Sequence, residues 1–66
     1  MEIGTASGKV WEILKAKGEL EISRIPKLIG EKTLIAYQAV GWLAREDKIK
    51  YRVKGDKVFV SLVHEA

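Results

Sequence analysis

The sequence predicts one small domain of the α+β class. Three observations predict it: two stretches with helical apolar spacing, a short segment with Gly and Pro between them, and two alternating stretches near the C-terminal end. Their order is helix, short strand, helix, helix, strand and strand, which is the order of a winged helix-turn-helix. We therefore expect residues 1–66 to form a single winged helix-turn-helix domain.

Length and composition restrict how this domain is stabilised. The chain has 66 residues and no cysteine, so neither a disulfide nor a thiolate metal site can support it. A single core supplies about 3–5 kcal/mol at this size, so packing, local structure or a partner subunit must provide the stability. No apolar run approaches the roughly 18 residues that span a bilayer. No signal peptide is visible either, so we expect a cytoplasmic protein with no membrane partner.

The first half of the chain predicts two helices and a short strand. Apolar spacing predicts a helix over about residues 5–17, which Gly18 ends in a left-handed conformation. Alternation over residues 19–23 (ELEIS) predicts a half-buried strand. A second, short helix is expected over residues 24–29, with the Ser23 side chain as its N-cap.

The longest stretch with a helical apolar period is 33–46, TLIAYQAVGWLARE. Its inner stripe is expected to face the core and repeats at helical spacing: Ala36, Ala39, Val40 and Leu43. Its opposite side has mixed chemistry: Leu34, Gln38, Gly41 and Arg45, with Ile35 and Trp42 beside them. This helix has the position of a recognition helix, but its outward side is unusually apolar.

The C-terminal part predicts a β-hairpin with a defined register. A two-residue loop at 55–56 suits a primed turn, because Gly55 tolerates positive φ. One face is then apolar and expected to cover the core: Ile49, Tyr51, Val53, Val58, Val60 and Leu62. The other face is expected to meet solvent: Lys50, Arg52, Lys54, Lys57, Phe59 and Ser61.

The positive charge of the chain is concentrated in this hairpin. Residues 48–57 contain five basic and one acidic residue, a sum of +4, whereas the rest of the chain contains seven basic and eight acidic residues, a sum of −1. Two interpretations remain open. The segment is either an ordinary solvated strand face or an electrostatic footprint for phosphate.

Three stretches of the chain resemble a known family. KVWEIL (residues 9–14), GELEIS (18–23) and GWLAREDKI (41–49) are similar to those of a small winged helix-turn-helix family of bacteria and archaea. Its members are stand-alone domains of about this length with no established function. The resemblance spans nearly the whole chain and implies the fold, but winged helices serve both DNA binding and protein docking.

The first functional hypothesis is a DNA-binding or transcription-regulator-like module, with double-stranded DNA as its partner. Gln38 is suited to pair with adenine, and Arg45 with guanine or a phosphate. The full set of candidates near the third helix is Lys32, Thr33, Gln38 and Arg45. The hairpin would contact phosphates through Lys50, Arg52, Lys54 and Lys57.

The alternative hypothesis is a protein-interaction domain that dimerises or docks a partner through the third helix without binding DNA. Exposed apolar patches mark protein interfaces, and Trp is a frequent hot-spot residue. The candidate interface residues are Leu34, Ile35, Gly41 and Trp42, and a homodimer is expected. Plainer interpretations are that Trp42 covers the edge of the core and that Gly41 is simply tolerated. Phe59 is expected to stack on a nucleic acid, to join a dimer interface, or to lie under Arg52.

Catalysis is not expected. The only histidine, His64, falls in a predicted tail over residues 63–66. The chain has no Gly-rich phosphate loop and no pair of ligands at metal spacing. We therefore expect no enzyme activity, no cofactor, no metal and no small-molecule substrate.

Overall fold

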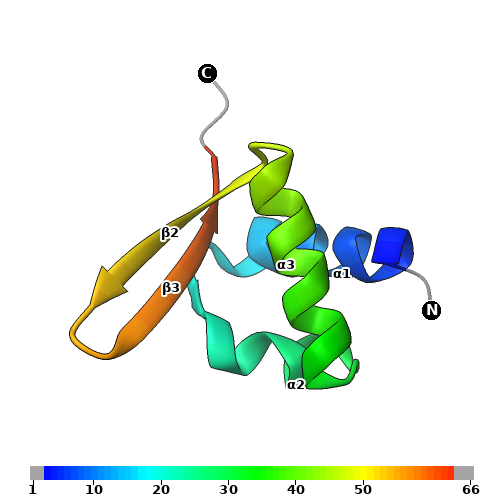
Figure 1. The fold of residues 1–66 in the computed structure, drawn as a ribbon, viewed down its shortest axis with the longest axis horizontal. Coiled ribbons are helices and arrows are strands. Elements are labelled where there is room, and N and C mark those ends of the chain that lie inside the picture. Colours follow the sequence, from blue (N-terminus) through cyan, green and yellow to red (C-terminus); the bar gives the residue numbers. More distant parts are fainter. Residues whose placement is uncertain (1–2, 64–66) are drawn as a thin grey trace.

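The computed structural model describes residues 3–63 and confirms the predicted winged helix-turn-helix order (Figure 1). The elements are α1 (Ile3–Lys17), β1 (Leu20–Glu21), a 3-10 turn (Ile22–Arg24), α2 (Ile25–Ile29), α3 (Thr33–Arg45), β2 (Ile49–Lys54) and β3 (Lys57–Leu62). His64 lies outside the described residues, so the prediction about it is not addressed by the structure.

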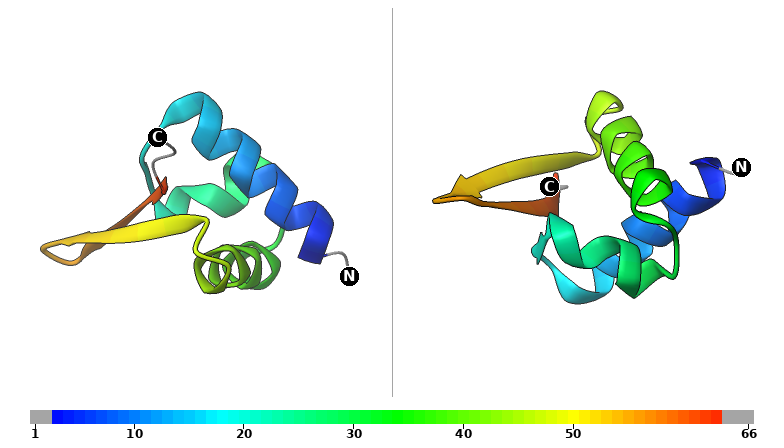
Figure 2. Two further views of the ribbon diagram at one scale, coloured as in Figure 1. Left: turned by 90° about the horizontal axis from the view of Figure 1, so that it is seen from above. Right: turned by 60° about the horizontal axis from the view of Figure 1, so that its bottom comes forward.

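The three helices pack together, and the β2–β3 hairpin, here called the wing (residues 49–62), projects away from them (Figures 1 and 2). The sheet is antiparallel with the order β1-β3-β2, so β3 is the central strand. β1 joins it through the pairs Leu20–Val60 and Glu21–Phe59. β2 is therefore an edge strand, and residues 46–48 connect it to the C-terminal end of α3.

The core lies where the three helices meet the base of the sheet. α3 contributes its predicted stripe, and every member of it is buried: Ala36, Ala39, Val40 and Leu43. The facing stripe of α1 is also buried: Ala6, Val10 and Leu14. Ile25 of α2 and the sheet residues Leu20, Ile49 and Val60 complete this core. The helical period of the sequence therefore predicted the buried face of α3 correctly.

The predicted register of the hairpin is confirmed at every pair, from Ile49–Leu62 at the base to Lys54–Lys57 at the tip. Gly55 has φ +63°, as its turn requires. The prediction that the whole apolar face covers the core is wrong, however. Because the wing extends beyond the helices, Tyr51 is 47% exposed and Val53 is 69% exposed.

The region around β1 also differs from the prediction. Only two residues pair with β3, because the chain leaves the sheet at once and turns into a 3-10 helix. Ser23 lies inside that turn and does not cap α2. The N-cap of α2 is Arg24, which makes no side-chain capping hydrogen bond, and Pro26 occupies the first turn.

The predicted helix ends are closer to the structure than the helix starts. Gly18 has φ +79° and its N–H donates to the carbonyl of Leu14 at 2.7 Å, so α1 ends as expected. α1 begins at Ile3, two residues before the expected start. Val63, which we expected to be the first residue of a C-terminal tail, is instead held against the fold. It is half-buried, and its N–H donates to the carbonyl of Lys48 at 3.0 Å.

We predict that Leu14→Ala unfolds most of the protein at 25 °C. Leu14 of α1 is almost completely buried in the core, and a Leu→Ala change in such a site costs about 2–5 kcal/mol. That loss is similar to the whole stability of about 3–5 kcal/mol expected at this size. Urea denaturation followed by circular dichroism measures it.

The matched control is Leu34→Ala, because Leu34 is 67% exposed on α3. We expect that change to alter the free energy of unfolding by less than about 0.5 kcal/mol. Equal effects of the two substitutions would contradict the placement of the core.

Candidate nucleic-acid interface

The outward face of α3 is fixed by its buried stripe. Since successive residues are 100° apart on a helix, the positions opposite the stripe are Leu34, Gln38, Gly41 and Arg45, and all four are exposed. A Cβ added to Gly41 would meet no heavy atom within 4 Å, so this position is open. The structure therefore brings together the two polar candidates of this helix, but sets them beside an exposed leucine and an open glycine.

The two flanks of α3 have different surroundings. Trp42, 45% exposed, lines a pocket with Trp11 of α1, so its flank faces α1. Ile35 lies on the same flank but is half-buried and packs against the core. Ile35 is therefore mainly an edge-of-core residue, whereas Trp42 keeps nearly half of its surface available.

Lys32 and Thr33 lie at the N-terminal end of α3. Lys32 is the N-cap residue and Thr33 is the first helical residue, and both side chains are exposed. No side-chain hydrogen bond caps this end, and the carbonyl of Lys32 accepts the N–H of Ala36 at 2.9 Å. Both residues are thus accessible at the end of α3 that lies away from the wing (Figure 1).

The wing has two faces of opposite chemistry. Because side chains alternate along a strand, the pairing places the wing cations on the face that points away from the helices: Lys50, Arg52, Lys54 and Lys57. Tyr51 and Val53 lie on the other face, which at its base joins the core. The structure therefore gathers the four wing candidates on one face of the wing. That face is opposite the one that joins the core beside α3.

Arg52 is already engaged within the protein. Its Nε and Nη2 each donate to the Glu19 carboxylate at 2.8 Å, and its guanidinium carbon lies 4.8 Å from the centre of the Phe59 ring. This geometry confirms the plainest interpretation of Phe59, which places it under Arg52. The hydrogen bond from Arg52, aided by its charge, lowers the pKa of the Glu19 carboxyl and raises the pKa of the Arg52 guanidinium.

The other three wing cations remain available for a ligand. Lys50, Lys54 and Lys57 are exposed, and none of them forms an ion pair within residues 3–63. Lys54 stands directly opposite Lys57 at the tip, where two like charges repel each other. Lys50 lies near enough to Glu19 to help lower the pKa of that carboxyl. An anion at the wing tip would relieve the repulsion between the two tip lysines.

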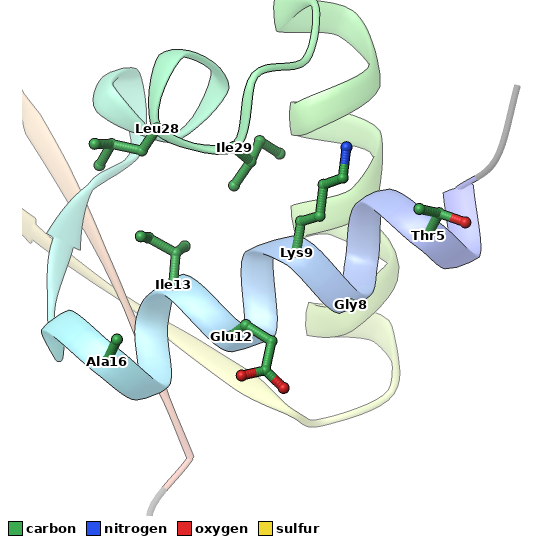
Figure 3. A pocket seen from close by; sticks show the side chains of 8 residues that line it. All are labelled: Thr5, Gly8, Lys9, Glu12, Ile13, Ala16, Leu28 and Ile29. Atoms are coloured by element: carbon green, nitrogen blue, oxygen red, sulfur yellow. The ribbon is translucent and has the colours of Figure 1, made fainter.

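A separate groove lies between α1 and α2, away from the predicted residues. Ile13 of α1 points toward Leu28 and Ile29 of α2, whereas the Glu12 carboxylate points to the other side of α1 (Figure 3). At one end of the groove, Lys9 Nζ lies 2.8 Å from Glu31 Oε2. The groove is thus mainly apolar between Ile13, Leu28 and Ile29, and its lysine is already paired.

Metal-ligand clusters and membrane-spanning helices are both absent from residues 3–63. No group of three His, Cys, Asp or Glu side chains among these residues lies close enough to hold a metal ion. No helix in this part of the chain has the length and apolar character needed to cross a membrane.

A family model described as a winged helix-turn-helix domain, DUF2582, matches residues 1–62. The chain belongs to this family. The resemblance seen in its sequence is thereby confirmed. The uncharacterised protein MJ1608 of Methanocaldococcus jannaschii is 42% identical over 62 residues, which cover 89% of this chain and 86% of that protein.

Solved structures share the fold of this family member. Protein BT2368 of Bacteroides thetaiotaomicron, solved by NMR, has a TM-score of 0.83 at 28% identity, covering 91% of this chain and 73% of that chain. The Zalpha domain of Carassius auratus PKZ, crystallised in complex with Z-DNA, has a TM-score of 0.80 at 17% identity, and the match covers 96% of this chain and 100% of that chain. A possible transcriptional regulatory protein of Mycobacterium bovis has a TM-score of 0.69 at 22% identity, and the match covers 92% of this chain and 70% of that chain. Below 25% identity, these last two similarities establish only the fold.

Several features of the family member's surface were not evident from its sequence. Tyr51 and Val53 were expected in the core but add to the exposed apolar surface. The pairing of Arg52 with Glu19 was also missed, although Glu19 alternates with Leu20 and so had to share a sheet face with the wing cations. That alternation was the one signal that could have indicated the contact.

We predict that the Glu19 carboxyl titrates below its ordinary pKa and that Arg52→Gln returns it toward that value. The folded-state pKa is lowered, so the ion pair stabilises the fold at neutral pH. This contribution is lost as the pH falls through the folded-state pKa of Glu19. An NMR titration of the side-chain carboxyl carbon measures both effects. Lys54→Gln is the control and should leave the midpoint nearly unchanged, and a wild-type midpoint at the ordinary value would contradict the ion pair.

Proposed function

We propose that the domain is a non-catalytic DNA-binding module of the kind found in transcription regulators, and that its wing makes the phosphate contacts. The observation that carries this proposal is the set of exposed wing lysines without an ion pair within residues 3–63: Lys50, Lys54 and Lys57. A basic segment of this kind is the electrostatic footprint of nucleic-acid binding. The Z-DNA complex of a domain with the same fold supports double-stranded DNA as the ligand.

In this proposal the wing residues have unequal roles. The three lysines contact phosphate, since all three are exposed and none forms an ion pair within residues 3–63, although Lys50 lies near the Glu19 carboxylate. Arg52 positions the wing against Glu19 and contributes less, because binding a phosphate would require it to break a bidentate ion pair.

The contribution of α3 is limited by its chemistry. Gln38 and Arg45 are the outward residues able to reach base edges or phosphates, with Lys32 and Thr33 at the beginning of the helix. Leu34 and Gly41 share that face and offer no hydrogen-bonding side chain. We therefore propose binding dominated by phosphate contacts, with little sequence discrimination.

We predict that duplex DNA binds at about 50 mM salt and that binding weakens steeply as salt is added. Each phosphate contact contributes about −0.9 to the slope of log K against log salt, so three lysines give a slope of roughly −3. Fluorescence anisotropy of labelled duplex DNA measures this slope. Lys54→Gln with Lys57→Gln should reduce its magnitude by roughly 2.

The matched control is Lys17→Gln with Lys27→Gln, which removes the same charge from exposed positions on α1 and α2. It should leave the slope nearly unchanged. No binding at about 50 mM salt, or equal losses in the two double variants, would refute phosphate binding by the wing.

A second candidate function is favoured by the exposed apolar surface of α3. Leu34 and Trp42 expose large apolar areas, and the open position at Gly41 lets another backbone approach closely. We propose this surface as a docking face, in the first instance for a second copy of the chain as a homodimer. Ile35, half-buried at its edge, would add only part of its side chain.

For this second candidate, we predict that the wild type sediments as a dimer and that Trp42→Ala shifts it toward the monomer. Truncating a central aromatic residue of an interface commonly costs about 2 kcal/mol or more, which is over tenfold in the dissociation constant. Leu28→Ala is the control, because Leu28 is partly exposed on α2 away from this face. A wild type that remains monomeric at about 1 mM would exclude the homodimer.

A further inference from the structure

A small pocket, here called the indole pocket, lies between α1 and the flank of α3 that faces it. Its volume is about 360 Å³, within the range of small-molecule sites. Its two aromatic residues are Trp11 of α1 and Trp42 of α3, which are the only tryptophans of the chain. Two indole rings at one pocket offer stacking surface to a flat ring.

The position of Trp11 within this pocket is supported by its own helix. A helical side chain leans toward the N-terminal end of its helix, so Trp11 covers the turn that contains Ser7. Lys15 follows Trp11 by one turn, and its Nζ lies 4.8 Å from the centre of the indole ring. This contact helps to order the indole ring of Trp11. Lys15 lies one helical turn after Trp11, and Ser7 lies one turn before it.

Ser7 supplies an unused hydrogen-bonding group. It lines the pocket and is only 4% exposed, and its Oγ has no hydrogen-bond partner within residues 3–63. Buried polar side chains are normally hydrogen-bonded, and a hydroxyl both donates and accepts. Because the Oγ has almost no exposed surface, a small shift of the pocket lining would let a polar group on the edge of a ligand provide the missing partner.

Gly8 keeps part of the pocket open. It lies within α1, where glycine is less favourable than alanine, and an added Cβ would meet nothing within 4 Å. Packing inside the protein therefore gives no reason for the missing side chain. Gly8 lines both the indole pocket and the groove between α1 and α2, so a ligand in the indole pocket could use this space.

The charges at the pocket indicate a neutral ligand. Glu12 and Lys48 both line it and are exposed, and their opposite charges favour neither an anion nor a cation. We propose that the indole pocket binds a neutral, planar heteroaromatic molecule of about nucleobase size. The ring stacks against the tryptophans, and a polar atom on its edge pairs with the Ser7 hydroxyl.

This site is separate from the proposed nucleic-acid contacts. It uses none of the wing lysines and none of Lys32, Thr33, Gln38 and Arg45. Only Trp42 is shared with the docking face of the second candidate function. Failure of DNA binding would therefore leave this proposal intact, and the reverse is also true.

The test is a titration of the full chain with adenine and with benzimidazole, followed by tryptophan fluorescence. Both tryptophans line the pocket, so the whole signal reports on it. We expect a saturable change with both flat probes and none with cyclohexanol, which has a hydroxyl but no flat ring. Shifted NMR signals of the Ser7 amide and of both indole N–H groups should accompany binding.

Two variants test the geometry. Gly8→Leu places a side chain in the open space and should abolish binding, whereas Ala16→Leu on the same helix lines only the other groove and should not. Ser7→Ala should weaken binding by roughly tenfold at most without lowering the melting temperature, because the hydroxyl has no partner to lose within residues 3–63.

Three results would overturn the proposal. The first is the absence of a saturable signal up to about 10 mM of either flat probe. The second is equal binding by Gly8→Leu and Ala16→Leu, which would place the probes elsewhere. The third is a Ser7→Ala variant that melts at a lower temperature and binds as well as the wild type, which would make the hydroxyl structural.

Discussion

The packing of α3 against α1 is the constraint on which the rest of the structure depends. The two buried stripes meet through small and branched side chains: Ala6, Val10 and Leu14 on α1, and Ala36, Ala39, Val40 and Leu43 on α3. Alanine at three of these positions lets the helices approach closely, while the larger residues fill the space beside them. This contact sets the rotation of α3, and therefore decides which residues face outward. The outward position of Gln38 and Arg45 is a consequence of what is buried behind them.

The wing begins in the core and extends beyond it into solvent. Ile49 and Val60 hold the base of the hairpin against the helices, but the same sheet face continues outward through Tyr51 and Val53 without a cover. Strand alternation then gives the projecting segment an apolar face and a cationic face. A two-stranded ribbon with two such different faces is only marginally stable alone. Its register therefore depends on the residue pairs at the foot of the hairpin and on the pairing of β3 with β1. The ion pair of Arg52 with Glu19 adds a polar tie on the outer face between β2 and the chain just before β1.

Features that follow from the spacing of residues within one helix or hairpin were predictable from the sequence. Features that depend on how far separate helices and strands extend over one another were not. The stripe of α3 and the hairpin register follow from spacings of a few residues, and both are confirmed. The exposure of Tyr51 depends on how far the helices reach beneath the sheet, which no local pattern encodes. Arg52 and Glu19 are 33 positions apart and meet only because β3 pairs with both β1 and β2 and so brings the chain just before β1 near β2. The approach of Trp11 to Trp42 likewise requires the α1–α3 packing, so no local pattern indicated a partner for either tryptophan.

The chemistry of the molecule separates two kinds of surface that a DNA-reading winged helix would combine. On this chain three lysines without an ion pair within residues 3–63 lie on the outer face of the wing, with two of them opposed at its tip, while α3 exposes Leu34 and Trp42. Lysine repulsion at the tip falls when a polyanion is bound, whereas an exposed leucine and tryptophan are stabilised by exclusion of water. Under the proposed functions, these requirements would be met by different ligands on different faces, so contact of the wing with phosphate would leave α3 available to a protein. Under the proposed function, the domain would hold DNA by its wing with little reading of bases through α3.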